Sequence, residues 1–245
     1  MARKTYSFAK RFTGIIILIL FTCILISGRG ISPVKTTALA IPGTMAAHLR
    51  LYETMELEKF GLSREAFEMA VKGFERLRAA GSIYNERILS IVDFSLPSNK
   101  KRLFIIDNIT GKLLYNTFVS HGRNSGKELA TKFSNQFNSF QSSLGFYITG
   151  QTYRGHHGYS LRLQGMEEGI NDNAYGRGIV MHAARYVNEN TARQNGSVGR
   201  SEGCPAIPVK MHRTIIEAIK NGTCLFVYGS DENYLMQSKL VQAHA

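Results

Sequence analysis

The segment RLFIIDNITGKLLYNTFVS, residues 102–120, decides the fold class of this 245-residue chain. Its two apolar runs are rich in β-branched and aromatic residues, and the Asn-Ile-Thr-Gly sequence between them is typical of a turn. We therefore expect two strands that pair as a hairpin. Apolar runs of the same kind predict further strands, so the chain is expected to be mainly β; they lie at residues 87–94, 145–149, 159–163, 178–182 and 223–228.

Helical patterns precede and follow these strands. Between Ser63 and Gly81 apolar residues recur at spacings of three and four, with Ser63 placed to cap a helix and Gly81 to end it. Residues 45–59 predict a partner helix, and one late helix is expected from Pro208 to Lys220, with Pro208 in its first turn. The predicted class is therefore α+β overall, with a helical hairpin before a mainly β body.

Composition divides the chain into four segments. Residues 1–40 combine a basic start with the uncharged apolar run IIILILFTCILIS at 15–27, which fits a secretory signal peptide better than a membrane span of about 20 apolar residues. A retained signal anchor is the alternative. In both cases the body is expected to be exported to the periplasm or cell envelope. We assign residues 41–82 to a helical extension, 83–230 to the main domain and 231–245 to a C-terminal tail.

The charge balance limits the classes of partner. The chain has 30 Lys and Arg against 18 Asp and Glu, and six of the basic residues lie before residue 41, which leaves a net charge of +6 beyond it. A moderately basic body suits an anionic polymer or surface. Because the sequence has no Arg/Lys stripe or nucleic-acid-binding motif, we expect no nucleic-acid partner.

Cys204 and Cys224 are the two cysteines beyond residue 40, and their settings differ. Cys224 lies in a predicted strand, where a buried and inert thiol is expected. Cys204 lies in the polar turn Arg200-Ser-Glu-Gly-Cys-Pro205, where Arg200 adds positive charge that would lower the thiol pKa. Gly203 permits an unusual backbone conformation, so the amides of Gly203 and Cys204 could bind an oxyanion together. A structural Cys204–Cys224 disulfide is the alternative.

His182 is the best candidate for a base that serves this thiol, because it ends the predicted strand at 178–182. A buried histidine held by a backbone carbonyl is the alternative. His121 and His157 lie in Gly-flanked loops and could line the same cleft, over which residues 121–143 are expected to form a long loop. No spacing typical of zinc ligands is present, so neither a metal nor an organic cofactor is expected.

The combined motifs resemble the YkuD-type L,D-transpeptidases, in which a strand-end His precedes a Ser/Thr-x-Gly-Cys motif. The resemblance is closer to the murein L,D-transpeptidase catalytic domain family and covers roughly residues 83–229. It is carried by four segments: HGYSLRL at 157–163, GINDNA at 169–174, RGIVMH at 177–182 and GRSEGCPA at 199–206.

This resemblance implies a two-sheet β-sandwich that performs acyl transfer on peptidoglycan stem peptides. Cys204 would attack the carbonyl of the third residue of a tetrapeptide, release D-alanine and form a thioester. His182 would be the base, and the backbone carbonyl of Ala183 would orient its ring. The resemblance also suggests substrate-binding residues, namely Ser201, Arg200, Asn173, Arg177, His157 and Tyr159.

Two positions depart from the family pattern. Glu202 stands where a His is usual, and Pro205-Ala206 replaces a hydrophobic-Arg pair, so Arg200 and Arg177 become the candidates for binding the substrate carboxylate. If water is the acceptor, the same site makes an L,D-carboxypeptidase or endopeptidase. A noncatalytic wall-binding module with the disulfide is a further alternative. The expected partner is peptidoglycan, with membrane anchoring through the N-terminal apolar segment if that segment is retained.

Overall fold

The computed structural model describes residues 44–242. The segment predicted as a signal peptide or anchor, residues 1–40, lies outside the described residues. None of the helices within 44–242 combines the length and the apolar character that crossing a membrane requires.

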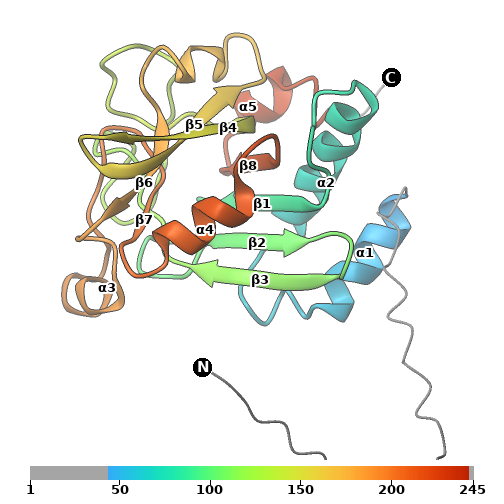
Figure 1. Cartoon of the computed structure of the whole chain (residues 1–245), viewed down its shortest axis with the longest axis horizontal. Coiled ribbons are helices and arrows are strands. Elements are labelled where there is room, and N and C mark those ends of the chain that lie inside the picture. The colour runs from blue at the N-terminus through green and yellow to red at the C-terminus, as the bar shows by residue number, and fades with distance from the viewer. Residues whose placement is uncertain (1–43, 243–245) are drawn as a thin grey trace, which may run out of the picture. The chain divides into compact units, whose positions relative to one another are not determined.

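The strands form an eight-stranded arrangement in the order β3-β2-β1-β8-β4-β5-β6-β7 (Figure 1). The expectation of a mainly β domain is confirmed, and each predicted strand is present. The short strand β7 was not predicted. The bounds are β1 Ile88–Asp93, β2 Leu103–Asp107, β3 Lys112–Thr117, β4 Gly145–Gly155, β5 Gly158–Gly165, β6 Val180–Ala184, β7 Ala206–Pro208 and β8 Cys224–Tyr228.

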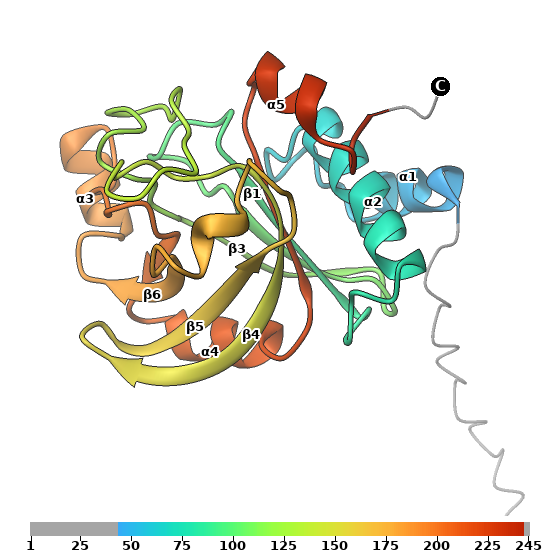
Figure 2. The same ribbon diagram turned by 90° about the horizontal axis from the view of Figure 1, so that it is seen from above.

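The two expected sheets are joined here into one hydrogen-bonded order. β8 links the two halves, since it pairs in parallel with β1 on one side and antiparallel with β4 on the other. The β4–β5 hairpin has a register shift between Thr149 and Thr152, and a shift of this kind bends and twists a strand pair. Figure 2 shows the curved hairpin reaching away from β1 and β3.

The predicted N-terminal helical hairpin consists of α1 Met45–Thr54 and α2 Arg64–Ala79. The Ser63 hydroxyl accepts a hydrogen bond from the Ala66 amide at 3.2 Å, which is the predicted N-cap. α2 packs directly on the strands: a Cβ placed on Gly73 would lie 2.0 Å from the Phe146 ring. α1 and α2 therefore share one hydrophobic core with the strands.

The predicted late helix exists, but its predicted start at Pro208 is wrong. α4 spans His212–Ile219, and Pro208 is the last residue of β7. A proline is tolerated there because it lacks a backbone N–H, and the end of a strand does not need that hydrogen-bond donor. Three further helical segments were not predicted: η1 Asp172–Ala174, α3 Glu189–Asn195 and α5 Glu232–Gln237.

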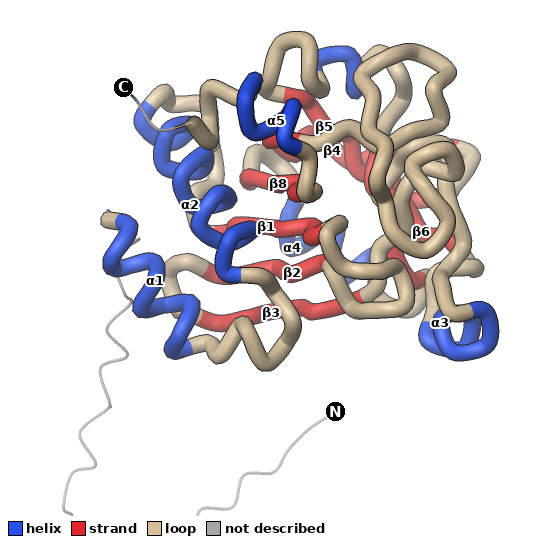
Figure 3. Tube along the Cα trace, turned by 180° about the vertical axis from the view of Figure 1, so that it is seen from behind, coloured by secondary structure: helices blue, strands red, loops and turns tan. Residues whose placement is uncertain are grey.

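The loop at residues 121–143 contains no helix or strand, as predicted, and joins the loops that gather around β6, at the end of the molecule away from α1 and α2 (Figure 3). His121 at its base is fully buried and accepts a hydrogen bond from Arg102 at 2.7 Å. Burial, followed by the charge of Arg102, lowers the pKa of His121 to about 4. The His121 imidazole is therefore neutral and is part of the buried base of the loop. The expectation that His121 lines the cleft is wrong.

Candidate active site

The turn that carries Cys204 is shaped by Ser201. The Ser201 hydroxyl donates to the Cys204 carbonyl at 2.6 Å and accepts from the Gly203 amide at 3.1 Å. Gly203 has φ +123°, and a Cβ there would lie 2.8 Å from the Gln141 carbonyl oxygen, so the turn requires glycine. Since its amide is engaged by Ser201, Gly203 is not a free oxyanion donor, which corrects the expected pair of amides.

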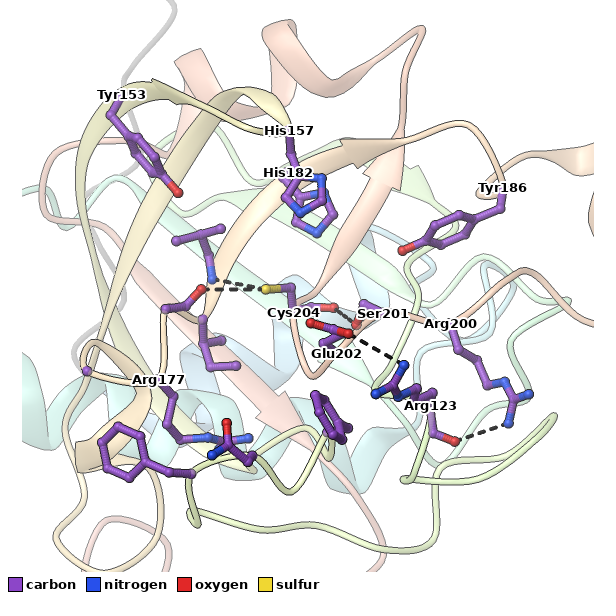
Figure 4. Close-up of a pocket in the computed structure, with 17 residues that line it drawn as sticks. Arg123, Tyr153, His157, Arg177, His182, Tyr186, Arg200, Ser201, Glu202 and Cys204 are labelled. Carbon is purple, nitrogen blue, oxygen red and sulfur yellow. Dashed lines mark hydrogen bonds and ion pairs between the residues drawn. The ribbon is translucent and has the colours of Figure 1, made fainter.

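β6 and β7 bring His182 to the same place. The two strands are parallel, with His182 opposite Ala206, two residues beyond Cys204. The His182 Nδ1–H donates to the Ala183 carbonyl at 3.0 Å. A carbonyl can only accept, so this bond fixes the tautomer that leaves Nε2 as a base. Figure 4 shows the imidazole on the same side of the pocket as the Cys204 side chain, and both side chains line this pocket.

Cys204 and His182 are both neutral near pH 7. Desolvation raises the pKa of the Cys204 thiol, although the Val180 amide 3.5 Å from the sulfur and the charge of Arg177 act in the opposite direction. Burial lowers the pKa of His182, the hydrogen bond to the Ala183 carbonyl acts in the opposite direction, and the charge of His157 lowers the pKa further. The expectation of a thiol pKa lowered in the resting protein is therefore wrong. The neutral thiol instead makes a long contact with the Gly178 carbonyl at 3.7 Å.

The pocket is a cavity of about 560 Å³ bounded by β4 and the β4–β5 turn, by β6 and the segment before it, by the Cys204 turn and by the 121–143 loop. The His157 ring, from the turn between β4 and β5, stacks on the His182 ring with 4.1 Å between centroids. Six of the predicted site residues line this cavity: Cys204, His182, Ser201, Arg200, Arg177 and His157.

Asn173 and Tyr159 do not line the cavity. The Asn173 amides bond to Asn135 at 3.1 and 3.2 Å, which fastens the 121–143 loop. The Tyr159 hydroxyl donates to Glu217 of α4, and Arg213 lies over its ring at 5.4 Å. The structure thus gives both residues structural contacts in place of the substrate contacts that the resemblance suggested.

Arg177 and Arg200 face the cavity but are already engaged by the protein. The Arg177 guanidinium makes four hydrogen bonds, of 2.6 to 3.1 Å, to residues 134–143. Arg200 donates to the carbonyls of Arg123 and Gly126, both at 3.1 Å. Both arginines therefore anchor the loop over the cavity.

A family model described as the L,D-transpeptidase catalytic domain matches residues 58–228, well over half of the chain. The chain belongs to this family. The expected family is thereby confirmed, and the matched residues begin before α2. None of the curated proteins is similar enough to this chain to be matched.

Solved structures similar to this L,D-transpeptidase domain include an L,D-transpeptidase from Mycobacterium smegmatis, with 13% identity, a TM-score of 0.36 and coverage of 58% of this chain and 59% of that one. L,D-transpeptidase 3 from Mycobacterium tuberculosis has 12% identity, a TM-score of 0.37 and coverage of 58% and 61%. The helical cell shape determining protein Pgp2 from Campylobacter jejuni has 14% identity, a TM-score of 0.37 and coverage of 69% and 58%. This chain thus spans about three fifths of the length of these proteins.

The two described cysteines of the L,D-transpeptidase domain are separate free thiols. Cys224 is fully buried in β8, whereas Cys204 opens into the cavity. The alternative of a Cys204–Cys224 disulfide is therefore wrong. Within residues 44–242, no cluster of three or more His, Cys, Asp or Glu side chains could hold a metal ion.

Sequence reasoning missed several residues that line the cavity of the domain. Tyr153 and Tyr186 stand at its sides in Figure 4, and Arg123 lies next to Glu202 at its floor. Arg123 directly follows His121 and Gly122, so a signal for it lay next to a residue that the sequence did single out. Tyr153 and Tyr186 carry no local signal, because only the curvature of the β4–β5 hairpin and the course of the chain after β6 bring them to the cavity.

Proposed function

We propose that this domain is a peptidoglycan L,D-transpeptidase that transfers an acyl group through a thioester on Cys204. The observation that carries the proposal is the joint placement of the Cys204 thiol and an oriented His182 imidazole in one cavity. A nucleophile, a base within the same pocket and a third group that orients the base are the parts that covalent acyl transfer needs. Family membership supports the same reaction class.

The acylation step uses the neutral pair. As the Cys204 sulfur bonds to the scissile carbonyl carbon, its proton passes to the Nε2 of His182, and the Ala183 carbonyl stabilises the imidazolium through Nδ1–H. The carbonyl π electrons move onto its oxygen, where the Cys204 amide is the candidate donor. When this oxyanion collapses, the bond to the D-alanine nitrogen breaks, and His182 returns the proton to that nitrogen. The products are a thioester and free D-alanine.

Deacylation reverses these roles with a new nucleophile. An amine from a second stem peptide gives a proton to His182 and attacks the thioester carbonyl. The sulfur leaves, takes back a proton and restores the neutral thiol. Water in place of the amine gives the L,D-carboxypeptidase reaction, because the acyl-enzyme is common to both.

The cavity suits a peptide that carries carboxylates. Its polar lining includes three arginines, and its aromatic side chains can pack against the stems of the substrate side chains. The tight packing of the 121–143 loop around Arg177 keeps the cavity formed without substrate.

Mass spectrometry of the full chain incubated with a disaccharide tetrapeptide tests the proposal. We expect an acyl adduct on the peptide that contains Cys204, an equal amount of released D-alanine, and a cross-linked product when a second stem peptide supplies the amine. The Cys204→Ala variant is the control. If the wild type forms no adduct and releases no D-alanine, the proposal is wrong; an adduct that yields only hydrolysed tripeptide would identify a carboxypeptidase.

We further propose that the domain works outside the cytoplasm, since peptidoglycan is the substrate of the proposed reaction. The apolar segment at residues 15–27 is the candidate export signal or anchor. Cell fractionation of the full chain and of a variant without residues 1–40 tests this. The full chain should reach the envelope, and the shortened chain should stay in the cytoplasm; equal export of the two would overturn the assignment.

A further inference from the structure

Three arginines line the cavity, Arg123, Arg177 and Arg200, and Glu202 is the one carboxylate in that lining. The Arg177 guanidinium donates through both terminal nitrogens to residues 134–143. Arg200 donates through one nitrogen, Nη1, to the carbonyls of Arg123 and Gly126. A ligand that recruited the Arg177 guanidinium would have to break contacts that hold the loop, whereas Arg200 is fixed to the loop through Nη1 alone. Arg123 differs from both, because its partner is the Glu202 carboxylate.

The Arg123 side chain is half exposed, at 49%, and its charged partner is the Glu202 carboxylate, 3.5 Å away and 68% exposed. An exposed ion pair of this kind adds little stability, because water and salt screen it. A carboxylate that arrives with a ligand can therefore replace Glu202 at little cost to the fold.

The Arg123 guanidinium is nevertheless held in place. It lies over the Phe140 ring, 3.9 Å from the centroid, which is a favourable cation–π position that limits its freedom. The Arg123 amide donates to the Ser201 carbonyl at 2.7 Å. Through Ser201, whose hydroxyl shapes the Cys204 turn, the backbone of Arg123 is tied to the nucleophile. A guanidinium group that is held in place in this way presents paired N–H donors that suit a carboxylate.

We propose that Arg123 binds the C-terminal carboxylate of the donor peptide, and that Glu202 occupies this position in the free protein and is displaced when the donor binds. The identity of the donor rests on the proposed function. The C-terminal carboxylate is the one carried by the leaving residue, directly beyond the scissile bond, and so is the carboxylate nearest to Cys204. Arg123 thereby takes over the recognition for which Arg177 and Arg200 were the candidates in the sequence.

Binding measurements separate this assignment from catalysis. The full chain with Cys204→Ala is titrated by calorimetry with the tetrapeptide, with its C-terminal amide, and with a tetrapeptide amidated only on the side-chain carboxylate of the third residue. Arg123→Gln should weaken binding of the free acid by about 10-fold or more, the usual effect of losing a charged hydrogen bond. Glu202→Gln should strengthen it, because the internal competitor is removed.

The amides and a control arginine complete the design. Neither variant should change the affinity for the C-terminal amide, and amidation of the side chain alone should leave both effects in place. Arg123→Lys should keep part of the preference for the acid. Arg154→Gln, which removes an exposed arginine of β4 outside the cavity lining, should leave all affinities unchanged.

The outcomes are distinguishable. If Arg123→Gln prefers the acid over the amide as strongly as its parent does, Arg123 is not the carboxylate site. If amidation of the side-chain carboxylate, and not of the C-terminal one, abolishes the effects of Arg123→Gln and Glu202→Gln on affinity, the assignment to the C-terminal carboxylate is wrong. Arg123-dependent binding without turnover by the wild type would uphold the site and overturn the proposed function. Absence of both binding and turnover would overturn both.

Discussion

The turn around Cys204 and the strand around Cys224 place the same chemical group in opposite settings. Cys224 lies in β8, which is paired on both sides by β1 and β4, and its side chain is fully buried. Cys204 lies in a turn built from the side-chain hydrogen bonds of Ser201, at the wall of a cavity. Desolvation raises the pKa of both thiols.

The difference between the two cysteines therefore lies in access and in the neighbouring base more than in their resting ionisation. The sulfur of Cys204 meets the Val180 amide, the charge of Arg177 and the cavity that it shares with His182. For Cys224, burial raises the thiol pKa, and the charge of Glu167 raises it further. The proposed reactivity of Cys204 therefore depends on the turn that opens it to the cavity beside His182.

Replacing each cysteine by alanine should give the largest difference between the two sites. Cys204→Ala should lower donor turnover by more than about 10³-fold, because the nucleophile is lost. Cys224→Ala should leave turnover nearly unchanged and lower the free energy of unfolding by about 1 kcal/mol, because it leaves a small gap in the core. Steady-state kinetics and urea unfolding measure the two effects. A large loss of turnover in Cys224→Ala, without unfolding, would contradict the comparison.

Removal of the base should have the next largest effect. His182→Ala should slow acylation of Cys204 by about 10²–10⁴-fold, the usual contribution of a positioned general base. His182→Gln, which keeps most of the side-chain volume, should be slowed similarly and serves if the alanine variant unfolds. His212→Ala, on α4 outside the cavity lining, is the control. Burst kinetics followed by mass spectrometry give the rate; a His182→Gln variant as fast as the wild type would remove His182 from the mechanism.

The pH dependence of thiol alkylation separates the two cysteines further. Because the pKa of the Cys204 thiol is raised, its thiolate fraction is small at pH 6 and should grow tenfold per pH unit, or about 100-fold by pH 8. Cys224 should stay unlabelled until the protein unfolds. Labelling of Cys204 that is fast and constant from pH 6 to 8 would instead indicate a preformed thiolate–imidazolium pair.

Turnover should follow a different pH dependence. The pKa of His182 is lowered below its usual 6.5, so the imidazole stays neutral above that value and loses its function as a base only as the pH falls below it. The acid limb of the acylation rate against pH should therefore lie below pH 6.5, which stopped-flow measurements with the tetrapeptide can establish. A limb above pH 7 would show that the charged imidazole is stabilised in the protein.

The backbone of the turn gives the smallest of the expected effects. Gly203→Ala combines positive φ with a Cβ 2.8 Å from the Gln141 carbonyl oxygen, and should cost about 1–3 kcal/mol of stability and shift the sulfur. Turnover should fall by about 10-fold as the alignment with His182 is lost. Gly196→Ala, with φ +68° and nothing within 4 Å of its Cβ, should lose some stability and no activity. Equal turnover in the two variants would show that the turn tolerates a shift of the sulfur.

Local patterns predicted the parts of the fold that depend on local forces. The strands from 88 to 117, the Ser63 cap and the end of α2 near Gly81 follow from side-chain periodicity and capping chemistry. β7 escaped prediction because it has three residues and depends on its pairing with β6. Pro208 was placed in a helix because proline favours both a first helical turn and a strand end, and only the pairing decides between them.

In the candidate site, too, local patterns predicted some features, and others depended on tertiary contacts. His182 and Cys204 were predicted from their motifs, and the pairing of β6 with β7 brings His182 to the turn that carries Cys204. Asn173 and Tyr159 were misplaced because a motif specifies neighbours in sequence, and their contacts are with Asn135 and Glu217, which are distant in sequence. The raised thiol pKa was also missed, because desolvation depends on atoms that the tertiary fold gathers around the sulfur.

By itself, the sequence determined the mainly β class, the helical hairpin and the family, and it predicted Cys204 and His182 as the thiol and the imidazole of the site, since each is encoded in short-range patterns of apolar and reactive residues. Only the tertiary structure decided that Arg123 pairs with an exposed carboxylate, that the Gly203 amide is already engaged by Ser201, and that burial raises the pKa of Cys204 and lowers the pKa of His182. These properties depend on hydrogen bonds and burial between segments that are far apart in the chain. They arise when the 121–143 loop, β6 and the Cys204 turn pack together.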